Sequence, residues 1–221
     1  MGKFADDYRD VVIHNGTDVE KFFPIKIKTK VKEALKYPSN KFILGYVGTL
    51  DYHKKLEMLI KAFCDFSKEK QEAYLVIIGD GPAYKELQLL IQKLKAQDKI
   101  ILKGWVPHKE INAHINCFDV AVHHYANVYM NPLKVFEYLS AGVPVIAPDI
   151  PTIKNYFIDQ QDLLITSGTR KDIYDKIEML FNDKNLRYKL SNKHDLIKRM
   201  ENNFTWENYS QRILYNIKRT L

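Results

Sequence analysis

Short apolar runs recur along the chain, and segments with helical periodicity separate them. The run at 42–48 is almost wholly apolar and of strand length, as in a parallel strand that is buried on both faces. Leu56, Ile60 and Phe63 follow at the spacing of one helix face. Such alternation predicts βαβ units and a parallel sheet with right-handed crossovers. The expected strands are 42–48, 74–79, 100–102, 119–123, 143–147 and 162–165.

The expected fold is α/β, a doubly wound, Rossmann-like parallel sheet of about six strands with helices on both faces. Residues 1–24 are expected to be a lead-in strand and loop from a preceding domain, with a strand at 11–14 and a turn at Asn15-Gly16. The Rossmann-like domain is expected to occupy 25–221, and the segment 29–37 fits either a helix or a linker. The expected closing helices lie near 169–183, 185–200 and 205–220.

The net charge of +7 favours anionic partners, which include nucleotides, nucleic acids and acidic lipid surfaces. No run combines basic and stacking aromatic residues, so we expect no nucleic-acid partner. No apolar run approaches the ~20 residues of a membrane span or forms a signal segment near Met1. We therefore expect a cytoplasmic protein that can contact an anionic membrane at its cytoplasmic face. Cys64 and Cys117 lack metal or redox spacing and are expected to be buried, reduced thiols.

Chemistry-bearing residues gather in four loops that follow the expected strands, at 48–55, 79–83, 104–107 and 123–132. In a doubly wound sheet these loops meet at the carboxyl edge, where ligands bind. The chain has neither G-x-G-x-x-G nor G-K-[ST], which disfavours dinucleotide dehydrogenases and P-loop enzymes. It also lacks paired metal-ligand spacings and a G-x-S-x-G elbow. The sequence therefore predicts a ligand site at this edge and no metal site.

The stretch 131–149 carries the strongest candidate chemistry. Asn131 is a suitable N-cap and Pro132 a suitable first helical residue, while Gly142 is placed to end the helix. A lysine in the first turn, Lys134, and free helical N–H groups can hold a phosphate. One turn later, the carboxylate of Glu137 can accept hydrogen bonds from ribose hydroxyls. The alternative is that Lys134 and Glu137 form only a surface ion pair.

Six segments in this order resemble a known family. They are similar to the carboxyl-terminal, donor-binding half of retaining glycosyltransferases of the GT-B fold, of the group 1 or family-four type. The closing FTWENYSQRIL also resembles the terminal helix of that family. The segments are VVIHNGTDVEKFFP, GYVGTLDYHKKLEMLIKAF, LVIIGDGP, ILKGWVP, FDVAVHH and PLKVFEYLSAGVPVIAPD.

The resemblance implies roles for individual residues. Lys54 matches a lysine that holds the donor pyrophosphate, whereas Thr49 replaces the family's arginine. Glu137 matches the glutamate that binds the ribose, and Lys134 matches a lysine that binds phosphate in one subgroup. Tyr129 stands where the family has a carboxylate that touches the sugar. Lys54 and Lys134 are the expected leaving-group stabilisers. The expected donor-binding residues are Gly48, Thr49, Lys54, Gly79, Gly104, Trp105, Val106, His124, Tyr129, Asn131, Pro132, Leu133, Lys134 and Glu137.

The resemblance implies transfer of a sugar from a UDP- or GDP-linked donor to an acceptor hydroxyl, with retention of configuration and no cofactor. The loop at 104–106 is expected to border the base. An amino-terminal domain that binds the acceptor would be a further partner, because the chain starts where that domain ends in the family. Two alternatives stay open: a GT-B-type sugar-nucleotide epimerase and a non-catalytic nucleotide-binding module.

Overall fold

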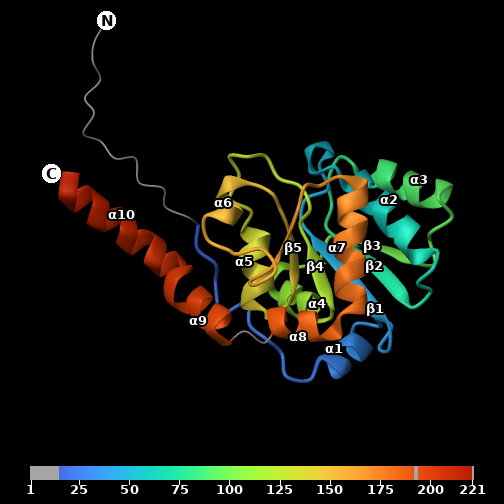
Figure 1. The fold of residues 1–221 in the computed structure, drawn as a ribbon, viewed down its shortest axis with the longest axis horizontal. Coiled ribbons are helices and arrows are strands. Elements are labelled where there is room, and N and C mark those ends of the chain that lie inside the picture. The colour runs from blue at the N-terminus through green and yellow to red at the C-terminus, as the bar shows by residue number, and fades with distance from the viewer. Residues whose placement is uncertain (1–14, 192–193, 221) are drawn as a thin grey trace, which may run out of the picture.

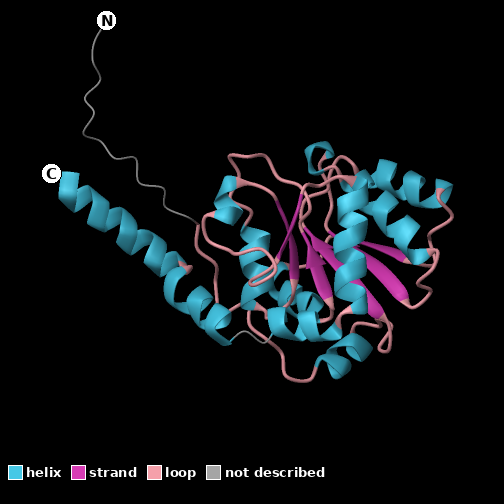
Figure 2. Cartoon of the chain, in the orientation of Figure 1, coloured by secondary structure: helices cyan, strands magenta, loops and turns pink. Residues whose placement is uncertain are grey.

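The computed structural model describes residues 15–191 and 194–220, and a six-stranded parallel sheet lies at its centre (Figures 1 and 2). The strand order is β3-β2-β1-β4-β5-β6, so the chain winds outward from β1 in both directions. All six predicted strands are present, with ends that differ from the predicted ones by no more than two residues. The strands are β1 Phe42–Val47, β2 Ala73–Ile78, β3 Ile100–Gly104, β4 Val120–Val122, β5 Val145–Pro148 and β6 Leu164–Thr166.

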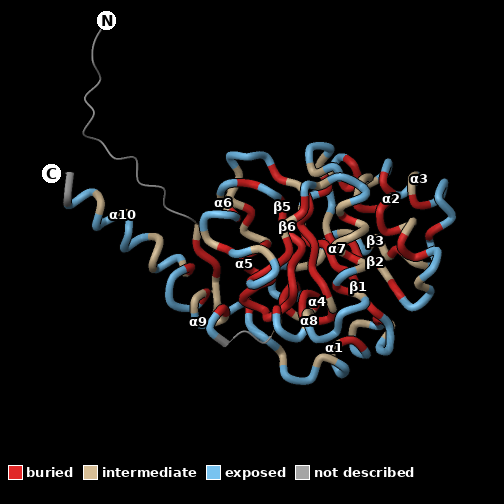
Figure 3. Tube along the Cα trace, in the orientation of Figure 1, coloured by how far each residue is buried: buried red, intermediate tan, exposed pale blue. Residues whose placement is uncertain are grey.

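Apolar residues on alternate positions of each central strand enter two separate cores. In β1, Ile43 and Val47 pack into one core, whereas Leu44 and Tyr46 pack into the other. The central strands are therefore buried on both faces, as Figure 3 shows. This burial explains why their sequences are continuously apolar instead of alternating.

Helices cover both faces of the sheet, which confirms the predicted doubly wound fold. The long helix α10 Trp206–Thr220 extends away from the sheet (Figure 1). Two short 3-10 turns, η1 Tyr52–Lys54 and η2 His108–Glu110, lie in the loops after β1 and β3. The first core is covered by α1 Lys28–Ala34, α4 Ile111–Asn116, α5 Leu133–Ser140, α6 Pro151–Lys154 and α9 His194–Asn203. The second is covered by α2 Leu56–Ser67, α3 Tyr84–Lys93, α7 Arg170–Asn182 and α8 Lys184–Ser191.

The segment 29–37, for which helix and linker were both open, is mostly helical, because it overlaps α1. Two other helical segments differ from expectation. The short helix α6 has no counterpart in the prediction. The single helix expected over 185–200 is wrong, because α8 and α9 are separate helices. Leu190 of α8 packs in the second core and Leu196 of α9 in the first, so the chain changes faces between them. The expected strand at 11–14 lies outside the described residues.

The structure also bears on the two cysteines and on the expectation that no segment spans a membrane. Cys117 is buried and Cys64 is partly buried, and both are free thiols. Within the described part of the chain, no helix is long and apolar enough to cross a membrane.

The loops after β1 and β2 are joined at the carboxyl edge by backbone contacts. Gly79 has a φ of +142°, and a Cβ there would lie 1.8 Å from the carbonyl oxygen of Gly48. The N–H of Leu50 donates to the carbonyl of Asp80 at 3.0 Å, and the N–H of Ala83 donates to the carbonyl of Leu50 at 2.8 Å. Because only glycine allows this close approach, Gly79 brings the two loops into one surface.

Candidate functional site

A cavity of about 290 Å³ lies at the carboxyl ends of β1 and β4, in front of the first turn of α5. Its walls come from the loop after β1, the loop after β4 and the start of α5. Their convergence follows from the fold, because β1 and β4 are neighbours at the point where the chain reverses its winding direction. The lining residues are Tyr46, Gly48, Thr49, Lys54, His123, Met130, Asn131, Pro132, Leu133 and Lys134.

Helix α5 begins one residue later than predicted. Pro132, with ψ of 96°, is the N-cap, so the predicted capping role of Asn131 is wrong. The reason is that an N-cap residue contributes its carbonyl and needs no N–H; the N–H of Val135 donates to the carbonyl of Pro132 at 3.0 Å. The preceding helical N–H groups have no intrahelical partner and lie at the cavity, where the helix dipole favours an anion.

The other end of α5 is closed as predicted, and its middle is anchored to the sheet. Gly142 has a φ of +65° and its N–H donates to the carbonyl of Leu139, while the N–H of Val143 donates to the carbonyl of Tyr138. These two bonds form a Schellman motif. The wholly buried hydroxyl of Tyr138 also lies 2.8 Å from the nitrogen and 3.2 Å from the carbonyl oxygen of Val47. Helix α5 is thereby held against the end of β1.

Lys134 and Glu137 form an ion pair with 2.6 Å between Nζ and Oε2. The ion pair of the alternative interpretation is therefore present, and it is mostly buried, since the side chains are only 23% and 10% exposed. Burial raises the pKa of Glu137, against the opposing charges of Lys134 and then His108. His108 follows the loop at 104–107 and packs edge-on against Phe22, and Nζ of Lys134 lies 5.8 Å from the centre of the Phe22 ring.

Lys54 brings a second ammonium group to the cavity from η1. Its Nζ lies 4.0 Å from Sδ of Met130 and has no ion pair among the residues that the structure describes. Lys54 and Lys134 therefore contribute two positive charges around one cavity, against the single carboxylate of Glu137. The excess of positive charge suits an anionic ligand.

Two polar side chains in the cavity wall have buried atoms without hydrogen-bond partners. Both ring nitrogens of His123 and Oδ1 of Asn131 are unpaired. Burial, followed by the charges of Lys54, His124 and Lys134, lowers the pKa of His123 to about 3, so its imidazole is neutral. Leaving such a group unpaired costs about 1–3 kcal/mol, and proteins seldom do so without a reason. A ligand with hydrogen-bonding groups would supply the missing partners.

His123 was missed by the sequence prediction, which selected its neighbour His124. Nε2 of His124 lies 3.0 Å from the carbonyl oxygen of Lys55, and burial lowers its pKa to about 4. It lines a different cavity, of about 280 Å³, together with Thr166. Strand parity would have separated the two histidines, because successive side chains point to opposite faces.

The structure brings half of the predicted donor-binding residues into the cavity and places the others around it. Tyr129 and Trp105 are 90% and 71% exposed on loops. Gly79 and Gly104 are joined by a backbone hydrogen bond of 2.9 Å, and Val106 packs against the first core. Glu137 reaches the site through Lys134. The predicted residues that line the cavity are Gly48, Thr49, Lys54, Asn131, Pro132, Leu133 and Lys134.

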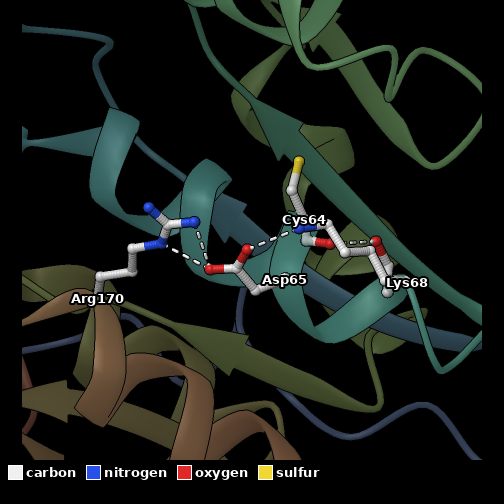
Figure 4. Close-up of polar contacts among 5 residues, drawn as sticks. Cys64, Asp65, Lys68 and Arg170 are labelled. Carbon is white, nitrogen blue, oxygen red and sulfur yellow. Dashed lines mark hydrogen bonds and ion pairs between the residues drawn. The ribbon is translucent and has the colours of Figure 1, made fainter.

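A larger cavity, of about 460 Å³, lies between α2 and α7 and shares no lining residue with the cavity before α5. Its charged groups are already paired: Figure 4 shows Arg170 directed at the carboxylate of Asp65, at 2.5 Å, with Lys68 also pairing to Asp65. This contact joins two helices and leaves no free charge for a ligand. Across the described residues, no cluster of three or more His, Cys, Asp or Glu side chains is arranged to hold a metal ion.

Comparison with known proteins identifies a family and a fold. The sequence matches the family described as glycosyl transferases group 1 over residues 27–195, well over half of the chain. It is similar to the alpha-monoglucosyldiacylglycerol synthase of Streptococcus pneumoniae, with 28% identity over 153 residues that cover 67% of this chain and 34% of the synthase. The chain spans about a third to about half of the length of the first curated relatives that it matches.

Two solved structures share the fold. HepE of Anabaena in complex with UDP superposes with a TM-score of 0.83 at 18% identity, covering 95% of this chain and 57% of that chain. The C-terminal domain of a group 1 glycosyl transferase, LpcC of Francisella tularensis, has a TM-score of 0.73 at 23% identity, covering 83% of this chain and 97% of that one. The cavity therefore lies in a fold shared with glycosyltransferase carboxyl-terminal domains.

Proposed function

This chain belongs to the group 1 glycosyl transferases, and from that premise we propose that it binds the nucleotide-sugar donor of a glycosyl transfer reaction in the cavity before α5. The observation that carries the proposal is the convergence of Lys54, Lys134 and a helix amino terminus on one cavity. Ammonium groups and unpaired helical N–H groups are ligands for phosphate oxygens. The donor's diphosphate lies among them.

The rest of the donor extends from the diphosphate in two directions. Glu137, one turn into α5, accepts hydrogen bonds from the ribose hydroxyls, and the loop at 104–106 borders the base. The contacts of Phe22 with both His108 and Lys134 support this arrangement, because Lys134 is the ion-pair partner of Glu137. UDP is the preferred nucleotide, since HepE, which shares the fold, was solved in complex with UDP.

In the reaction, the chain acts on the leaving group. As the bond between the sugar and the diphosphate breaks, negative charge grows on the leaving oxygen, and Lys54, Lys134 and the α5 amino terminus stabilise it. Transfer proceeds with retention, needs no cofactor, and requires an amino-terminal domain that binds the acceptor. Partial coverage of the relatives supports the need for such a domain.

A second candidate function is nucleotide binding without transfer. Tyr129 favours it, because a fully exposed aromatic side chain stands where the resemblance implies a sugar-binding carboxylate. Sugar transfer by this chain after addition of its amino-terminal domain would exclude this candidate.

Binding of UDP, GDP, ADP and uridine, measured by thermal shift, tests the proposal. A ligand at ~100 times its dissociation constant stabilises the folded protein by about 2.7 kcal/mol. For a chain of this size we expect the melting temperature to rise by roughly 5–10 °C with UDP. The chain alone should bind UDP without transferring sugar. No shift with any of the three diphosphates at millimolar concentration would refute the proposal.

A further inference from the structure

His123 is a histidine side chain in the cavity whose hydrogen-bonding capacity the protein does not use. Its residue is 5% exposed, it follows β4 directly, and neither ring nitrogen has a partner. Its ring stacks on that of Tyr46, with 6.1 Å between centroids and 15° between planes. The stacking fixes the ring in the cavity wall, where both nitrogens are buried and have no hydrogen-bond partner within the described residues.

The two lysines that line the same cavity indicate which ligand the His123 ring contacts. Lys54 from η1 and Lys134 from α5 line the same cavity and act electrostatically on His123. The adjoining residue, His124, also lowers the pKa of His123, and no carboxylate is among the groups that shift this pKa. The cavity that His123 shares with Lys54 and Lys134 therefore favours an anionic ligand.

A neutral imidazole has one N–H donor and one acceptor nitrogen, whereas ionised phosphate oxygens only accept hydrogen bonds. We propose that neutral His123 donates a hydrogen bond to the diphosphate of the bound nucleotide, between the ammonium groups of Lys54 and Lys134. This inference rests on the proposed function, since it assigns a further contact in the same donor site. His123 thus adds a donor to the diphosphate site without adding a third positive charge.

Another buried histidine provides a matched comparison. Nδ1 of His114 lies 2.7 Å from the hydroxyl of Tyr37, and burial lowers its pKa to about 4. It does not line the donor cavity. His114 is therefore a buried, neutral histidine whose hydrogen bond stabilises the fold. His123 is a buried, neutral histidine that makes no hydrogen bond within the described residues and can make one with a ligand.

The test compares His123→Phe, His123→Gln and His114→Phe by calorimetric binding of UDP and of uridine, together with melting temperatures. Phenylalanine keeps the ring and its stacking on Tyr46 but removes the N–H, and glutamine keeps an N–H donor. A hydrogen bond to a charged group corresponds to roughly a 10- to 150-fold change in affinity. We expect His123→Phe to weaken UDP binding by that factor, to change uridine binding less than about twofold, and not to lower the melting temperature. His123→Gln should recover part of the lost affinity.

His114→Phe should show the opposite behaviour, with a lower melting temperature and unchanged UDP affinity. In the wild-type protein, the His123 imidazole resonance should move on UDP addition and its pKa should rise, because the phosphate charge offsets Lys54 and Lys134. This measurement stands even where a variant folds poorly.

Two results would overturn the inference while leaving the proposed function intact: UDP binding by His123→Phe within twofold of wild type, or equal losses of UDP and uridine affinity. A His123 resonance that does not respond to bound UDP would overturn it as well. Failure of the wild-type chain to bind any nucleoside diphosphate would instead refute the proposed function, and this inference with it.

Discussion

A buried histidine and an asparagine side chain lie near the amino edge of the sheet, and a second such pair lies near its carboxyl edge. The two pairs differ in whether they are hydrogen-bonded within the protein. Near the amino edge, His114 bonds to Tyr37, and Asn116 bonds to the backbone of the segment 23–25 with distances of 2.8 and 3.1 Å. Near the carboxyl edge, the ring nitrogens of His123 and Oδ1 of Asn131 have no partner. The same residue types hold the fold together at one edge and remain available to a ligand at the other.

The carboxylates of Asp119 and Glu137, at opposite edges, also differ in how many of their hydrogen bonds are made within the protein. Oδ2 of Asp119, at the start of β4, accepts from the N–H of Ile43 at 2.8 Å and from Lys32 at 3.1 Å. Glu137, near the opposite edge, has an ion pair with Lys134, and burial raises its pKa. Oδ2 of Asp119 thus has two donors within the fold. Glu137 has one, and it is left with capacity to accept further hydrogen bonds.

The largest expected effect comes from substitution of Lys134, the ion-pair partner of Glu137, compared with Lys32, the ion-pair partner of Asp119. Lys134→Ala should weaken UDP binding roughly 10- to 150-fold, because it removes a charged hydrogen-bond donor from the diphosphate. Uridine binding should hardly change, whereas Glu137→Ala should weaken the binding of both ligands. Titration calorimetry measures all four affinities. Lys32→Ala is the control, and it should lower stability without changing UDP affinity. Equal losses of UDP affinity in the two variants would contradict the assignment of ligand binding to the carboxyl edge alone.

The asparagines provide a stability test. Asn116→Ala should lower the free energy of unfolding by about 1–3 kcal/mol, because it removes two hydrogen bonds to the partly buried backbone at 23–25, each of about 0.5–1.5 kcal/mol. Asn131→Ala should change stability by less than about 0.5 kcal/mol, since its buried oxygen makes no hydrogen bond in the free protein. Urea denaturation of both variants gives these values. A destabilisation by Asn131→Ala as large as that by Asn116→Ala would show that Asn131 also supports the fold.

The two histidines should make the protein sensitive to acid. Burial lowers the pKa of His114 to about 4 and that of His123 to about 3, so below about pH 6.5 the unfolded chain binds more protons than the folded one. Stability is then lost as the pH falls from about 6.5 toward those values, by up to about 1.4 kcal/mol per pH unit for each histidine. Replacing either with phenylalanine should reduce the loss between pH 6.5 and 5 by about 1.5 kcal/mol.

Urea titrations at several pH values check this dependence. Saturating UDP should reduce the part of the acid sensitivity that comes from His123, because the phosphate raises its pKa in the folded protein, and should leave the part from His114. An unchanged pH dependence in His123→Phe would show that the ring is not buried in its neutral form.

The smallest effect is expected from removal of divalent cations. The cavity already has the ammonium groups of Lys54 and Lys134 for the diphosphate, so UDP affinity should change less than about twofold in excess chelator. Calorimetric titrations with magnesium and with chelator measure the difference. A large loss of affinity in chelator would mean that the carboxyl edge accepts its ligand through a metal ion instead of through these lysines.

Much of the fold could be predicted from local patterns. Apolar runs such as Phe42–Val47 predicted the central strands, because a strand buried on both faces needs apolar side chains at all positions. Gly142 predicted the end of α5, since its positive φ suits glycine. The start of α5 was predicted one residue early, because Asn131 and Pro132 both have plausible capping roles and only the backbone conformation decides between them.

The sequence by itself determined the sheet, its doubly wound topology and the presence of Lys54 in a loop and of Lys134 and Glu137 on a helix at one edge, because periodicity and residue type are local properties. Only the tertiary structure decided which polar groups would be satisfied. His123 and His124 are neighbours in the chain. The ring of His124 lies 3.0 Å from the backbone carbonyl of Lys55, whereas His123 lines the cavity before α5. Hydrogen-bond satisfaction depends on what distant segments bring close, and local pattern does not contain that information.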